Sequence, residues 1–92
     1  MSEVPVGTVP RVAAKARLEW DEVRQRHVLL YPEGLVALNA TAAEVLRLCD
    51  GERAVGQIVE TLKRRYKSDR IDGEVAALLH GLAAKGLVIY VR

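Results

Sequence analysis
The sequence predicts an α+β domain, with a three-stranded antiparallel meander followed by a three-helix bundle, similar in order to a winged helix-turn-helix domain. Three observations lead to this fold class. The chain has 92 residues, the size of one domain. Short apolar runs separated by turn residues come first, and apolar residues at helical spacing follow. Half of the residues are apolar and 28% are charged, the balance of a globular chain.

Residues 1–15 hold two prolines, a glycine and no sustained periodicity. We interpret them as a flexible N-terminal arm, since chain ends are often poorly ordered, and residues 16–92 as a single domain. An alternative is that Val4, Val6 and Val9 form a docking strip.

The residues between 17 and 31 predict two strands. Arg17–Asp21 alternates polar and apolar side chains, so Leu18 and Trp20 are expected to face the core. His27–Tyr31 is almost entirely apolar, which is typical of a strand that is covered on both faces or is central in its sheet. The polar residues between the two strands fit a turn.

Leu35–Leu38 predicts the third strand, joined to the second by the corner Pro32-Glu33-Gly34. Proline has no N–H to donate, so it ends the pairing, and Gly34 is expected to supply a positive φ in the turn. The outer edge of the third strand is predicted to stay open, where it could accept the backbone of a partner.

Two helices follow the meander. Thr41-Ala42-Ala43-Glu44 has the pattern of a capping box, so a helix is expected from Thr41 to about Cys49, with Gly51 ending it in the left-handed conformation. An apolar stripe predicts the second helix over Val55–Tyr66.

A third helix is expected from residue 69 or 70 to Lys85, where Gly86 stops it, and residues 87–91 predict a short strand or an extended tail. The outer face of this helix is rich in alanine and lacks the side chains that read base edges in DNA. It suits the wall of an apolar groove, so the pattern favours a peptide ligand over DNA.

No catalytic or metal-binding pattern stands out in the sequence. The two histidines, His27 and His80, lie 53 positions apart with no other ligand at suitable spacing, so no metal and no cofactor are expected. Cys49 falls on the inward face of its helix and is interpreted as a small buried apolar residue rather than a nucleophile. The sequence therefore predicts a protein that is not an enzyme.

Composition also indicates the cellular location of the protein and the kinds of partner it can bind. A single cysteine, no signal-peptide pattern and no apolar run approaching about 18 residues indicate a cytoplasmic protein. The net charge of +2 is too small to indicate a nucleic-acid binder. The basic run Lys63-Arg64-Arg65, with Lys67 and Arg70, could be a solvated face, receive an acidic peptide or protein, or receive a nucleic-acid backbone.

Several motifs resemble the PqqD family, over roughly residues 16–90. The most specific part is the YPE corner joined to LN-x-T-A and CDG. The matching residues are Trp20, Asp21, Val23, Arg24, Leu29–Gly34, Leu38-Asn39, Thr41-Ala42, Val45-Leu46, Leu48–Gly51, Ile58-Val59, Leu62 and Val75–Val88.

The resemblance implies a winged-helix-like peptide-recognition domain with no catalysis of its own. Such a domain binds the ribosomally made precursor peptide PqqA and presents it to the radical SAM enzyme PqqE in the biosynthesis of pyrroloquinoline quinone (PQQ). In related domains the peptide pairs with the third strand and lies against the third helix. Carried over to this sequence, the resemblance points to Leu35, Val36, Ala37, Leu38, Ala76, Leu79 and Ala83 as peptide-binding residues.

Two other functions remain open at this point. A winged-helix DNA-binding regulator would bind with an affinity that falls steeply with salt. A structural adaptor would dock on an enzyme through the first two helices. A monomer is expected, although strand exchange at the Pro32-Glu33-Gly34 corner could give a strand-swapped dimer.

Overall fold

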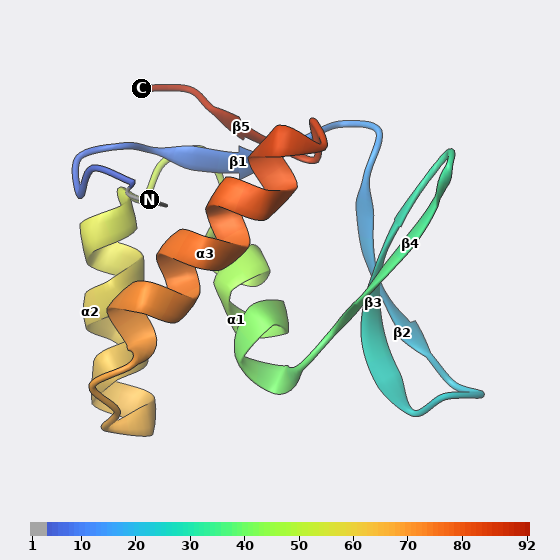
Figure 1. Ribbon diagram of the computed structural model, residues 1–92, viewed down its shortest axis with the longest axis horizontal. Coiled ribbons are helices and arrows are strands. Elements are labelled where there is room, and N and C mark those ends of the chain that lie inside the picture. Colours follow the sequence, from blue (N-terminus) through green and yellow to red (C-terminus); the bar gives the residue numbers. More distant parts are fainter. Residues whose placement is uncertain (1–3) are drawn as a thin grey trace.

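The structure is a computed structural model that describes residues 4–92, and it confirms the α+β class, with a three-stranded meander followed by three helices (Figure 1). A second sheet, of two strands, joins the two ends of the chain. In chain order the elements are β1 (Pro10–Val12), β2 (Arg17–Asp21), β3 (Arg26–Tyr31), β4 (Gly34–Leu38), α1 (Ala40–Leu48), α2 (Val55–Tyr66), α3 (Ile71–Ala84) and β5 (Val88–Tyr90).

The meander has the strand order β2-β3-β4, so β3 is central as predicted. Leu29 of β3 is completely buried, and Leu18 of β2 packs against the same core. Trp20 departs from the expectation, because its side chain is 47% exposed. It lies on the same face of β2 as Leu18 but near the end of the strand, where its ring and that of His27 pack edge to face with their centroids 4.9 Å apart.

The corner between β3 and β4 is a two-residue loop, Pro32 and Glu33, closed by the pair Tyr31 and Gly34. The expected positive φ at Gly34 is wrong, since Gly51 and Gly86 are the glycines in residues 4–92 with positive φ. Gly34 is instead the first residue of β4, and a Cβ there would lie 3.7 Å from the hydroxyl oxygen of Tyr31.

Helix α1 begins earlier than the predicted capping box. Asn39, with extended backbone angles, is the N-cap, and its side-chain oxygen accepts a hydrogen bond from the Ala42 N–H at 2.8 Å. Thr41 therefore lies inside the first turn, and the capping box with Glu44 is wrong. The predicted left-handed Gly51 after the helix is confirmed, with φ at 81°.

The described part of the segment 1–15 contributes to the fold. β1 pairs with β5 in antiparallel register, and Val9 and Ala13 on either side of it are buried. The proposed docking strip is divided, because Val6 is 73% exposed whereas Val4 packs partly against the core. Residues 1–3 of the expected arm lie outside the described residues.

The same segment caps α2. Ala54, the N-cap of this helix, has no side-chain oxygen to accept a hydrogen bond. The backbone oxygen of Thr8 accepts from the Val55 N–H at 2.8 Å, and that of Val6 accepts from the Gly56 N–H at 2.9 Å. A Cβ on Gly56 would stand 3.4 Å from the Val6 oxygen, so this close approach favours glycine. The chain thus satisfies two helix-terminal N–H groups from a distant segment.

Deleting residues 1–8 is expected to lower the free energy of unfolding by about 1–3 kcal/mol, because both backbone caps of α2 are lost. Urea denaturation followed by circular dichroism measures the change. Thr8→Ala is the matched control, since it keeps the backbone oxygen and should leave stability nearly unchanged. A truncated chain as stable as the full chain would contradict the capping role.

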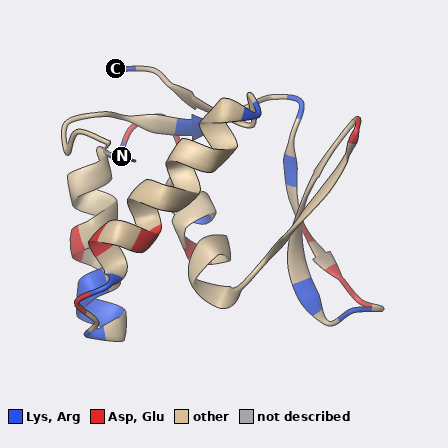
Figure 2. Ribbon diagram, viewed as in Figure 1, with Lys and Arg blue, Asp and Glu red and all other residues tan. Residues whose placement is uncertain are grey.

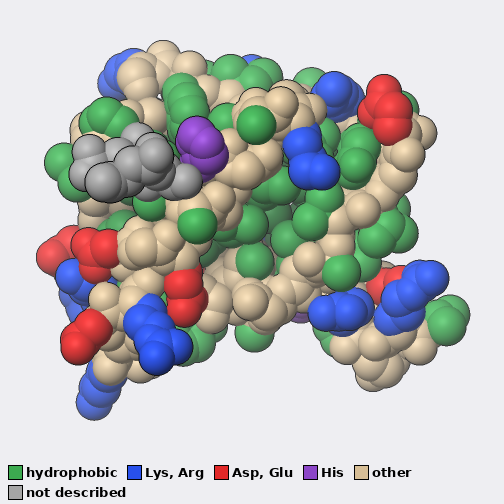
Figure 3. All heavy atoms as spheres, in the orientation of Figure 1, with side chains coloured by type: hydrophobic (Ala, Val, Ile, Leu, Met, Phe, Trp, Pro, Cys, Tyr) green, Lys and Arg blue, Asp and Glu red, His purple; other side chains and the backbone are tan. Residues whose placement is uncertain are grey.

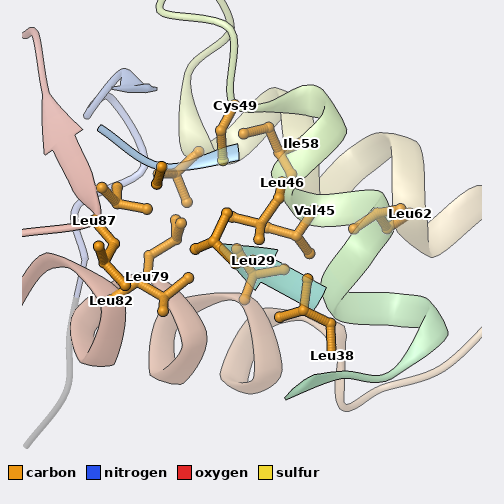
Figure 4. Close-up of a cluster of buried hydrophobic side chains, with 14 of the residues drawn as sticks. Leu29, Leu38, Val45, Leu46, Cys49, Ile58, Leu62, Leu79, Leu82 and Leu87 are labelled. Carbon is orange, nitrogen blue, oxygen red and sulfur yellow. The ribbon is translucent and has the colours of Figure 1, made fainter. Parts of the chain in front are cut away.

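The main core lies where β3 meets the three helices (Figure 4). Leu29 points from β3 toward Val45 and Leu46 of α1, and Leu79 of α3 lies across from them (Figure 4). This packing holds β3 and α1 against α3.

Candidate functional site
The outer edge of β4 carries unpaired backbone groups. A two-residue loop is closed by a hydrogen-bonded pair, so Gly34 bonds to β3. Bonded and non-bonded residues alternate along an antiparallel ladder, so Val36 and Leu38 also bond to β3. The N–H and C=O groups of Leu35 and Ala37 therefore point to the open edge, which pairs with no strand within residues 4–92.

A hollow lies next to the end of β4, where Asn39 lines it, between the start of α1 and the side of α3. Its volume is about 240 Å³. In the space-filling view, hydrophobic side chains cover the depression between α3 and the β3–β4 hairpin (Figure 3). The residues lining the hollow are Asn39, Thr41, Ala42, Val45, Glu74, Ala77 and Leu78.

The predicted strand residues divide between surface and core. Leu35 and Ala37 are exposed at the open edge, and Val36 is partly buried against the core. Leu38 is only 3% exposed, so its side chain faces inward. Their role in peptide binding stays a prediction, and their backbone positions give it a physical basis.

The predicted helix residues lie away from the hollow. Leu79 is fully buried in the core. Ala76 and Ala83 are partly buried but do not line the hollow. The side of α3 that lines it carries Glu74, Ala77 and Leu78, at the i, i+3, i+4 spacing of one helix face.

Sequence reasoning also missed the contribution of α1. Asn39 follows β4 directly, so the first turns of α1 must start beside the β4 edge. Thr41, Ala42 and Val45 reach the hollow from there. The short connection between strand and helix was the available signal, because it leaves α1 little freedom to lie elsewhere.

Three of the five residues in the basic cluster, Lys63, Arg64 and Arg65, form ion pairs with acidic side chains. These ion pairs are Lys63–Asp72 at 2.8 Å, Arg64–Glu60 at 3.4 Å and Arg65–Glu44 at 2.8 Å. The hydrogen bond from Lys63 also lowers the pKa of Asp72. Since these exposed pairs offset the positive charge, the cluster is better described as a solvated face than as a phosphate-binding surface.

Few reactive or metal-binding side chains are found elsewhere in residues 4–92. Burial raises the pKa of the Cys49 thiol to about 12, which keeps it protonated and unreactive. No group of three or more metal-binding side chains is found across residues 4–92. In the same range, every helix is too short or too polar to cross a membrane.

An unpaired strand edge beside an apolar hollow defines a class of small binding domains. In this class an extended peptide adds a strand to the sheet, and the neighbouring hollow selects its side chains. The site is thus described by backbone geometry and apolar shape, and not by a set of reactive groups.

Comparison with known proteins identifies the family. The family model described as coenzyme PQQ synthesis protein D (PqqD) matches residues 26–88. The PqqA binding protein of Methylococcus capsulatus is 38% identical over 81 residues, covering 88% of this chain and 87% of that protein. The PqqA binding protein of Rhodopseudomonas palustris strain TIE-1 is 44% identical over 94 residues, covering 100% and 89%. The chain therefore belongs to the PqqD family, which confirms the resemblance found in the sequence.

A solved structure agrees with this assignment. It is the solution NMR structure of the PqqD truncation of Methylobacterium extorquens PqqCD, described as a functional, stand-alone recognition element for ribosomally synthesised and post-translationally modified peptides. It shares 38% sequence identity with this chain, with a TM-score of 0.81 and 96% of each chain covered. The fold of the two proteins is the same.

Proposed function
We propose that this protein is a non-catalytic peptide chaperone of PQQ biosynthesis, which binds the precursor peptide PqqA and presents it to the radical SAM enzyme PqqE. The observation that carries the proposal is the open β4 edge, where Leu35 and Ala37 offer unpaired backbone groups. The strand leads from Leu38 into Asn39, which lines the hollow. The names of the relatives support PqqA as the peptide.

In this mode of binding, PqqA adds a fourth strand to the meander. Backbone hydrogen bonds to Leu35 and Ala37 supply affinity that does not depend on sequence. Alternate side chains of the peptide turn toward α3, where the hollow has room for an apolar side chain. The protein acts in the cytoplasm as a monomer, and binding needs no metal or cofactor.

A titration of isotope-labelled protein with synthetic PqqA, followed by NMR, tests the binding proposal. The largest shift changes are expected at the Leu35 and Ala37 amides and around Ala77 and Leu78. The amides of β1 serve as an internal control, since this strand belongs to the other sheet. Absence of shift changes in β4 and α3 at roughly tens of micromolar peptide would rule out the proposed function.

The presentation step has its own test. PqqE is expected to modify PqqA faster when this protein is present at a concentration that saturates the peptide. The control omits the protein from the same reaction. An unchanged rate would leave peptide binding intact and remove the chaperone role toward PqqE.

A further inference from the structure
We propose that the peptide groove has an electrostatic direction: Glu74 selects a basic side chain of PqqA at one end, and Lys85 with Lys15 selects an acidic side chain at the other. The groove means the open β4 edge together with the hollow and the facing side of α3. The inference rests on the proposed function and adds the charges that determine in which direction the peptide runs along β4.

Glu74 is placed to act on a bound peptide. Its side chain lines the hollow together with Asn39 and Thr41, and the residue is exposed. It takes part in none of the ion pairs found among residues 4–92. Its carboxylate is therefore available to a cation or an N–H donor from a ligand.

Two lysines mark the other end. Lys85 follows Glu74 by 11 positions, about three helical turns, so it projects from the same side of α3. The ammonium of Lys15 lies 3.7 Å from where a Cβ on neighbouring Gly86 would stand, which puts both cations at the C-terminal end of α3. Figure 2 shows this division, with red in the first turns of α3 and blue at its end and in the turn before β2.

The separation of these charges sets a spacing for the peptide. Eleven residues of α3 span about 16 Å, which an extended chain covers in about five residues. β4 runs alongside, and its Leu38 end lies next to the Glu74 end because Asn39 lines the same hollow. The groove therefore favours a basic and an acidic side chain about five positions apart, with the basic one near Leu38.

Other charged side chains lie near both ends of the groove. Glu33 lies in the corner before Gly34, at the opposite end of β4 from Leu38, and is one negative charge against the two lysines. Arg24 and Arg26 line a second hollow that meets the first at Asn39. Arg24 is held in an ion pair with Asp21. The N-terminus of α1 carries a partial positive charge near Glu74, which is smaller than the full charge of the carboxylate.

Charge reversal on both partners tests the direction. Synthetic PqqA and a set of its single charge reversals are titrated against wild type, Glu74→Lys and Lys85→Glu by fluorescence anisotropy. Reversing one basic residue of the peptide should weaken binding to wild type by about fivefold, and Glu74→Lys should restore it. Reversing one acidic residue should do the same, with Lys85→Glu restoring it. The two peptide positions are expected to lie about five residues apart.

Glu60→Lys and Arg64→Glu are the matched controls, because they make the same charge changes on the exposed side of α2 and should restore nothing. If the lysine and glutamate variants fail to fold, Glu74→Gln and Lys85→Gln should instead make binding insensitive to the two reversals. A peptide set in which no reversal is restored by either variant overturns the electrostatic direction. Unmodified PqqA that fails to bind wild type overturns the proposed function itself, which separates the two failures.

Discussion
Leu79→Ala is expected to lower the free energy of unfolding by about 2–5 kcal/mol, because it empties space in the centre of the core. Leu79 is fully buried and belongs to the cluster that joins β3 to the helices. The resemblance pointed to this residue as part of the peptide site, so the variant also separates a role in the core from a role in peptide binding. Urea denaturation measures stability, and titration with PqqA at low temperature measures affinity.

Leu78→Ala is the comparison variant for Leu79→Ala. Leu78 is partly buried and lines the hollow. Its replacement by alanine should lower the free energy of unfolding less than Leu79→Ala does, and should weaken PqqA binding more. Folded Leu79→Ala is expected to keep PqqA affinity within about twofold of wild type, since its side chain does not reach the surface. Near-normal stability combined with lost peptide binding would show that Leu79 belongs to the site after all.

Ala37→Pro is expected to weaken PqqA binding by at least about tenfold while the domain stays folded. The Ala37 N–H points to the open edge, so proline removes a donor that the peptide would use and places its ring in the path of the added strand. Proline is tolerated at such a position because β3 does not need that N–H. Anisotropy with labelled PqqA measures the loss.

Ala40→Pro is the matched control for this prediction. Ala40 is the first residue of α1, where proline is well accommodated, and Asn39 before it already has the extended backbone that proline requires. Its PqqA affinity should equal that of wild type. Val36→Pro is unsuitable, because it removes a bond of the β3–β4 ladder and would unfold the strand. Tight binding by folded Ala37→Pro would exclude strand addition at β4.

The sequence predicted the elements whose signals are local. The apolar stripe of α2 gave its bounds, Val55–Tyr66, and the alternation in Arg17–Asp21 gave those of β2. The start of α1 was missed because Asn39 and Thr41 are both good capping residues, and only the extended backbone at Asn39 decides between them. The local sequence pattern does not show which of these two residues caps the helix.

The features missed in the site depend on contacts between distant segments. A helical stripe identifies the buried centre of α3 but not which flank lines the hollow, so it did not point to Ala77 and Leu78. The peptide-binding role of Ala76 and Ala83 stays a prediction. β1 was missed for the same reason, since its three residues have no period of their own and gain their conformation from β5. The open edge of β4 was predicted, because the chain passes directly from the last strand of the meander into a helix and no further strand follows there to cover its outer edge.

The pairing of β1 with β5 has a consequence for the order of folding. Pro10 lies opposite Tyr90, so this contact closes a loop of about 80 residues and raises the contact order of a small domain. The meander and the helices can form from nearby segments, whereas β1 must wait until β5 has been synthesised. During translation the open edge of β4 is therefore expected to be complete before β1 and β5 are joined, and closing the small sheet is expected to be the final step toward the native state.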